Sequence, residues 1–111
     1  MIFAKFDTRS DGSIRLVMKG HAGAAPKGED LVCAGATTLA YTAAQAVLTL
    51  QEQGKLTRKP KMALSEGNAL IIATPTQEGR QELEQAIGVV GLGLEMLSHN
   101  YPHCIRLENT M

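Results

Sequence analysis

The sequence predicts an α+β fold, in which a mainly antiparallel sheet carries two helices packed on one face. Two alternating apolar segments flank a glycine-containing turn near the N-terminus, and two long apolar segments have the length of helices. Short strand-like segments separate and follow the helical ones. The predicted order is ββαββαβ, in a single domain over residues 1–111. A chain of this length buries roughly two thirds of its unfolded surface.

Alternation indicates the first two strands. Over Ile2–Asp7 every second residue is apolar, and residues 14–19 repeat the pattern after the hairpin signal Ser10-Asp11-Gly12-Ser13. A long apolar segment from Leu31 to about Gln53 predicts the first helix, which Gly54 ends.

The second half of the chain predicts the remaining four elements. Lys61–Ser65 and Ala69–Ala73 are expected to be short strands. Thr74-Pro75-Thr76-Gln77 offers a threonine N-cap, a proline at the first helical position and a capping-box glutamine. We therefore expect a second helix from this point to about Ser98, and a final strand over His103–Glu108.

Composition excludes several classes of function. The net charge of zero and the pI near 6.8 give no long-range attraction for nucleic acid or anionic membranes. We read the basic cluster over residues 55–61 as a solvated loop. The N-terminus does not resemble a signal peptide and no segment is expected to span a membrane, so we expect a cytoplasmic protein with reduced cysteines. No metal site and no cofactor are expected.

The first helix has little polar surface. Its opening turns are apolar or small almost all the way round, which favours burial on two sides. A homodimer would cover the second side. Alternatively, a solvated face is formed by Thr37, Thr38, Thr42 and Gln45.

His21 and Cys33 lie twelve residues apart, one after a strand and the other at the start of the first helix. A helix N-terminus and a nearby imidazole are common means of stabilising a thiolate nucleophile. Asp30 is a candidate N-cap that would place Cys33 in the first turn, where unpaired amides could stabilise an oxyanion. His21 can reach the thiol only if the preceding strand ends or bulges at Gly20. The alternative is that Cys33 is a small buried hydrophobe.

The motifs resemble those of a known family. Gly20-His21-Ala22-Gly23, followed by Gly28-Glu29-Asp30-Leu31-Val32-Cys33-Ala34-Gly35, is similar to the ribosomal-processing cysteine protease family Prp. The likeness extends from the opening hairpin to Tyr101-Pro102 before the final strand. It implies a dimeric cysteine endopeptidase with a Cys33/His21 dyad. It also implies that the substrate is the precursor of a large-subunit ribosomal protein, which loses a short N-terminal extension after an aromatic residue.

Supporting roles follow from the same motifs. Gly20, Ala22, Gly23, Gly28 and Asp30 would support the substrate loop, a mobile cover expected over residues 22–29. Thr37 stands where the family often has serine, and Ala24-Ala25-Pro26 stands where it usually has an aromatic residue. Two alternatives remain: a non-catalytic module that binds ribosomal protein or assists assembly, and a redox-sensing thiol at Cys33.

Overall fold

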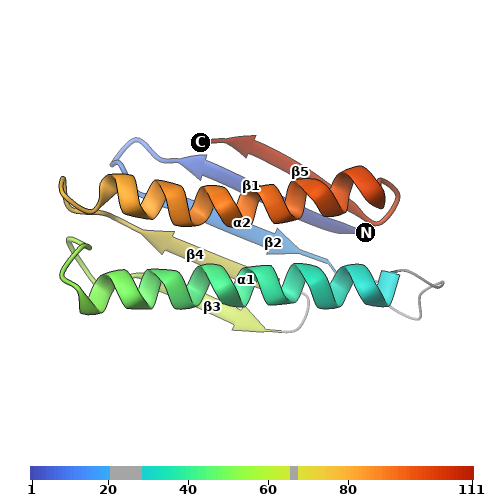
Figure 1. The fold of residues 1–111 in the computed structure, drawn as a ribbon, viewed down its shortest axis with the longest axis horizontal. Helices are drawn as coiled ribbons and strands as arrows, with labels where there is room; N and C mark the ends of the chain where they lie inside the picture. Colours follow the sequence, from blue (N-terminus) through green and yellow to red (C-terminus); the bar gives the residue numbers. More distant parts are fainter. Residues whose placement is uncertain (21–28, 66–67) are drawn as a thin grey trace.

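The computed structural model describes residues 1–20, 29–65 and 68–111. Its five-stranded sheet has the order β3-β4-β2-β1-β5, and both helices lie on the same face of it (Figure 1). The β1–β5 pair is parallel and the other pairs are antiparallel. This confirms the predicted α+β fold. The elements are β1 (Ile2–Thr8), β2 (Ile14–Lys19), α1 (Glu29–Glu52), β3 (Lys61–Ser65), β4 (Asn68–Ala73), α2 (Arg80–Asn100) and β5 (Ile105–Thr110).

The hydrophobic core lies between the sheet and the two helices. The inward residues of β1 and β2 are those that alternation predicted, and Phe6 is fully buried at the centre. On the helix side, Val32 and Val47 from α1 and Leu83 and Leu94 from α2 are fully buried. Strands β1, β2 and β4 therefore turn one face to the core and the other away from it.

The small residues of helix α1 pack mainly within the chain itself. Ala36, Ala40 and Ala43 are buried in the core, whereas the polar residues Thr38 and Thr42 are exposed. Within the single chain, the polar residues of α1 therefore form an exposed face, as the solvated-face interpretation expects. The segment Leu31–Glu52 is long and apolar enough to span a membrane by length and composition, contrary to the sequence expectation. One third of that apolar window is buried in the core of the chain.

The ends of α1 differ in how well they were predicted. Gly54 ends the helix at a φ of +72°, as expected, and the Lys55 amide donates to the Leu50 carbonyl at 2.9 Å, as in a Schellman motif. The start was wrong: the helix begins at Glu29, so Asp30 lies inside it rather than at the N-cap.

The predicted start of the second helix was also wrong. Helix α2 begins at Arg80, and the preceding Pro75 forms a β-bridge with Leu56. The Thr76 amide donates to the Lys55 carbonyl at 2.8 Å, and the Thr76 hydroxyl accepts a hydrogen bond from the Gly79 amide at 3.0 Å. The Leu56–Pro75 bridge and the Thr76–Lys55 hydrogen bond hold this segment against an earlier one, so tertiary pairing overrides the local capping signal at Thr74.

The final strand is displaced by two residues from its predicted position. It covers Ile105–Thr110 rather than His103–Glu108, because α2 continues to Asn100 and a turn intervenes. In that turn the Cys104 amide donates to the Tyr101 carbonyl at 2.9 Å. Cys104 therefore lies outside the sheet.

Candidate active site

Strand β2 ends immediately before the histidine motif. Its last residue is Lys19, and Gly20 then takes a φ of +99°, which L side chains rarely adopt. A Cβ on Gly20 would also collide with the carbonyl oxygen of Met1. We expected His21 to reach Cys33 only if the strand ended or bulged at Gly20. The strand does end there.

Cys33 is the fifth residue of α1 and is half-buried against the core. The first four N–H groups of a helix lack intrahelical acceptors, so the Cys33 amide belongs to the helical ladder. The dipole effect also falls off within the first turn. The predicted first-turn position of Cys33 is therefore wrong, and its own amide is a poor oxyanion donor.

A pocket of about 410 Å³ opens beside Cys33. It lies between the first half of α1 and the adjoining ends of β1, β2, β3 and β4. Gly20 and Thr37 line it with Cys33, so the structure brings together three of the residues that the sequence singled out. The floor includes Ile2 and Met18. An apolar pocket with a few polar groups at its mouth is typical of a substrate site.

The pocket also contains residues that the sequence analysis missed. Tyr41 follows Thr37 by one helical turn and Cys33 by two, a spacing that puts all three on one side of α1. That periodicity could have identified Tyr41. Ser65 and Asn68 face each other across the β3–β4 pair and line the same pocket. Strand register placed them there, and no local motif marks them.

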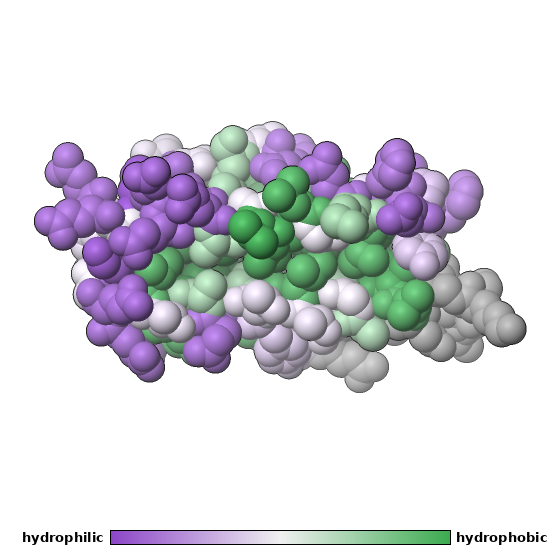
Figure 2. Space-filling view, in the orientation of Figure 1, coloured by the Kyte–Doolittle hydropathy of each residue, from purple (hydrophilic) through white to green (hydrophobic). Residues whose placement is uncertain are grey.

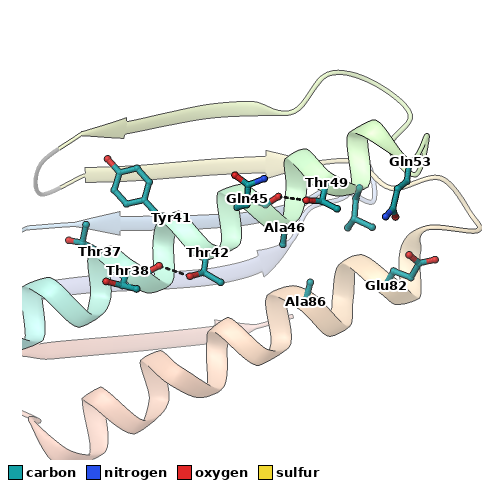
Figure 3. Close-up of a pocket in the computed structure, with 11 residues that line it drawn as sticks. Thr37, Thr38, Tyr41, Thr42, Gln45, Ala46, Thr49, Gln53, Glu82 and Ala86 are labelled. Carbon is teal, nitrogen blue, oxygen red and sulfur yellow. Dashed lines mark hydrogen bonds between the residues drawn. The ribbon is translucent and has the colours of Figure 1, made fainter.

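A larger groove of about 910 Å³ runs farther along α1 (Figure 3). It shares Thr37, Thr38 and Tyr41 with the pocket beside Cys33 and continues past Thr42 to the start of α2 at Glu82. The hydroxyls of Thr38, Thr42 and Thr49 donate to carbonyls of the preceding turn, as Thr42 does to Thr38 at 2.7 Å. Among the described residues that line the groove there is no cysteine, so we place the candidate site in the smaller pocket, which Cys33 lines.

Four residues of the predicted site lie outside the described part of the chain. These are His21, Ala22, Gly23 and Gly28. The expected substrate-covering loop over residues 22–29 also lies outside the described part, except for Glu29, which is the first residue of α1. Among the residues that the structure does describe, no group of three histidine, cysteine or acidic side chains is arranged to hold a metal ion.

Comparison with known proteins identifies the relationship. The chain is similar to the Staphylococcus aureus essential ribosomal processing protease Prp in complex with a covalently linked product peptide, with 22% identity and a TM-score of 0.72. That match covers 99% of this chain and 100% of the other. The same protease with a substrate peptide matches at 20% identity, a TM-score of 0.72 and the same coverage.

A third solved structure, SMU.848 from Streptococcus mutans, matches at 25% identity and a TM-score of 0.68, covering 99% of this chain and 94% of that one. None of the curated proteins matches the chain. The sequence model of the family described as cysteine protease Prp matches residues 1–106. Because that match spans nearly the whole chain, the protein belongs to the Prp family of cysteine proteases.

Proposed function

We propose that this enzyme is a cytoplasmic endopeptidase that removes the N-terminal extension of a large-subunit ribosomal protein precursor, using Cys33 and His21. The position of Cys33 in a peptide-sized pocket that Gly20 also lines is the observation that carries the proposal. Gly20 is directly followed in sequence by His21, which supports the assignment of His21 as the partner of Cys33. The Staphylococcus aureus relative holds a substrate peptide and a covalently linked product peptide.

In the proposed reaction, the His21 imidazole takes the proton from the Cys33 thiol, and the thiolate attacks the scissile carbonyl carbon. The tetrahedral oxyanion collapses, the amine leaves with the proton that His21 donates, and a thioester remains on Cys33. Water activated by His21 then hydrolyses the thioester and regenerates the thiol. Since the dipole of α1 acts weakly at its fifth residue, His21 supplies most of the stabilisation of the thiolate.

The defining experiment uses a peptide that spans the extension and the first mature residues of the ribosomal protein from the source organism. We expect Cys33→Ala to abolish cleavage without unfolding the chain, since alanine suits a helix. We expect His21→Ala to lower kcat by roughly 10²–10⁴-fold. Cys104→Ala is the matched control, because Cys104 lies in the turn before β5, and it should cleave at the wild-type rate.

Thiol alkylation separates this proposal from its alternatives. In a Cys104→Ala background, the rate of iodoacetamide labelling of Cys33 reports the thiolate population as pH varies. His21→Ala should move that profile to higher pH. A non-catalytic binding module would hold the peptide uncut in the wild type. A cysteine that is equally reactive with and without His21 would overturn the dyad.

We also propose that the protein is a homodimer, joined through the exposed apolar side chains on its helices. Val89, Leu92 and Met96 are 60–67% exposed and recur along one side of α2, and Leu31 of α1 is 62% exposed. Figure 2 shows hydrophobic residues gathered over the two helices. The surface is therefore made of large side chains, rather than the small residues that first suggested a dimer.

Sedimentation at micromolar concentration tests this assembly. The wild type should sediment as a dimer, and Leu92→Glu should convert it to a folded monomer, because a buried unpaired charge is costly at an interface. Glu95→Gln, on the same helix but outside the apolar set, is the control. A wild type that remains a monomer would contradict the proposal.

A further inference from the structure

The sheet has a second face, turned away from both helices and from the viewer in Figure 1. No element in the described ranges covers it. We call this surface the outer sheet face. Strand alternation and register assign to it Phe3, Lys5, Asp7, Lys61, Ala63, Arg15, Val17, Lys19, Leu70, Ile72, Arg106, Glu108 and Thr110. Ser65 and Asn68 share this register, but at the end of the β3–β4 pair they line the pocket beside Cys33.

The charge of the outer sheet face is hidden by the neutral net charge of the chain. The face carries five cationic side chains against two carboxylates, which leaves three positive charges. Helices α1 and α2 together carry six acidic residues and one arginine. The net charge of zero, from which we expected no attraction for nucleic acid, is therefore the sum of two sides of opposite sign.

At one end of the outer sheet face, the positive side chains are already paired with carboxylates. Arg15 donates to both carboxylate oxygens of Asp7, at 2.9 and 2.7 Å, so this pair neutralises itself at one end. Glu108 stands beside Lys5 in the register of the parallel pair. The cations that remain at the other end are Lys19 and Arg106, both exposed.

These two cations flank an exposed aromatic ring. Phe3 pairs with Lys19 on one neighbouring strand and with Arg106 on the other, and 54% of its surface is exposed. Adjacent strands lie about 4.8 Å apart, so the two cationic residues are separated by about 10 Å at the backbone. A depression of about 550 Å³ includes all three residues together with Lys5, Arg15 and Glu108.

The row Arg106–Phe3–Lys19 lies directly behind the candidate active site. Ile2 and Met18, the chain neighbours of Phe3 and Lys19, line the pocket beside Cys33 on the opposite face of the sheet. Since successive strand residues point to opposite faces, the two surfaces share the same stretch of β1 and β2.

A flat ring between two cations matches the repeat of a single-stranded nucleic acid. Bases stack on exposed aromatic rings, and lysine or arginine neutralises the phosphates on either side. An acidic peptide would use the cations but would leave the ring without a stacking partner. Three positive charges and one exposed ring supply less anchoring than an anionic bilayer requires from a peripheral protein.

We propose that the outer sheet face binds single-stranded RNA, with a base stacked on Phe3 and the flanking phosphates on Lys19 and Arg106. This binding is independent of peptide cleavage, because none of the three side chains lies on the Cys33 side of the sheet. Its effect would be to hold an RNA segment close behind the peptide pocket.

Fluorescence anisotropy with a fluorescein-labelled twelve-nucleotide oligouridylate, titrated with the full chain at several salt concentrations, tests the proposal. Phe3→Ala should weaken binding by roughly 5- to 150-fold, and Phe3→Tyr should restore it, since one stacked base contributes about 1–3 kcal/mol. Lys19→Gln and Arg106→Gln should each weaken binding and lower the slope of log K against log salt by roughly 0.7.

Lys59→Gln provides the matched control, because it removes the same charge from the exposed loop before β3. It should bind like the wild type, and cleavage of the short peptide should be unchanged in Phe3→Ala. Absence of binding at low salt would overturn the proposal. So would equal weakening by Lys59→Gln, which indicates diffuse attraction, or equal affinity for a labelled ten-residue polyglutamate, which indicates an acidic protein partner.

Discussion

Gly20 lies so close to Met1 that a side chain at residue 20 would collide with the Met1 carbonyl oxygen. This contact joins Met1 to the end of β2, at the residue before His21. The positive φ of +99° at Gly20 reinforces the requirement for glycine. The packing of two backbones therefore fixes where the chain leaves the sheet beside the Cys33 pocket.

Gly20→Ala should lower both stability and activity. A non-glycine residue at such a φ costs about 1–3 kcal/mol, and displacement of Met1 adds to that cost. Urea unfolding measures the first effect and peptide cleavage the second. Gly54→Ala is the control: its φ is +72°, but no atom lies within 4 Å of the added Cβ. We expect it to lose stability alone. Full activity in Gly20→Ala would contradict a positioning role for this residue.

Thr37 offers a test of the polar mouth of the pocket. It lines the pocket one helical turn after Cys33, within reach of a peptide bound there. Thr37→Val keeps the shape and removes the hydroxyl, so we expect kcat/KM to fall about fivefold to tenfold, the value of one hydrogen bond. Thr37→Ser keeps the hydroxyl and should retain the wild-type value. Equal kinetics in all three proteins would show that the hydroxyl does not contact substrate.

Replacing two glycines of α2 by alanine separates the effect of helix propensity on stability from the effect of packing between the helices. A Cβ on Gly88 meets no atom within 4 Å, so Gly88→Ala should raise the free energy of unfolding by about 0.5–1 kcal/mol. A Cβ on Gly93 would lie 2.7 Å from Leu39 Cδ2 of α1. Gly93→Ala should therefore gain less, or lose stability, in the same urea titration. Equal gains would mean that Leu39 yields without cost.

The spacing of apolar residues and the residues typical of turns were sufficient to predict much of the fold. Alternation located β1 and β2, and glycine marked the end of α1, because these signals depend on residues close in sequence. Thr76 was misread as part of a helix start, since its pairing with Lys55 depends on a segment about twenty residues away. Tertiary contacts of this kind leave no local pattern.

In the candidate site, too, residues marked by a local motif could be predicted, and residues placed by tertiary contacts could not. Cys33 was recognised from its motif, and Thr37 from its place in the family pattern, so both could be assigned before the structure. Ser65 and Asn68 enter the pocket only because β3 and β4 pair in one register. The charge of the outer sheet face likewise required strand register, because its residues are scattered through the sequence.

The acid limb of the stability profile should depend on two carboxylates in the β1–β2 hairpin. Hydrogen bonds from the Ser13 hydroxyl and amide lower the pKa of Asp11 to about 2. Hydrogen bonding from Arg15 lowers the pKa of Asp7 below its usual range. A lowered pKa in the folded state stabilises the protein at pH values above the unfolded pKa of about 3.9. That contribution is lost as the pH falls through the folded pKa.

We therefore expect the free energy of unfolding to decrease between about pH 4 and pH 2 in urea titrations at fixed ionic strength. Asp11→Asn retains an oxygen that accepts from Ser13 but cannot titrate, so its stability should change less over this interval. Arg15→Gln should also reduce the decrease, because the pKa of Asp7 then returns towards its ordinary value. Acid profiles identical to that of the wild type in both variants would show that other carboxylates control acid unfolding.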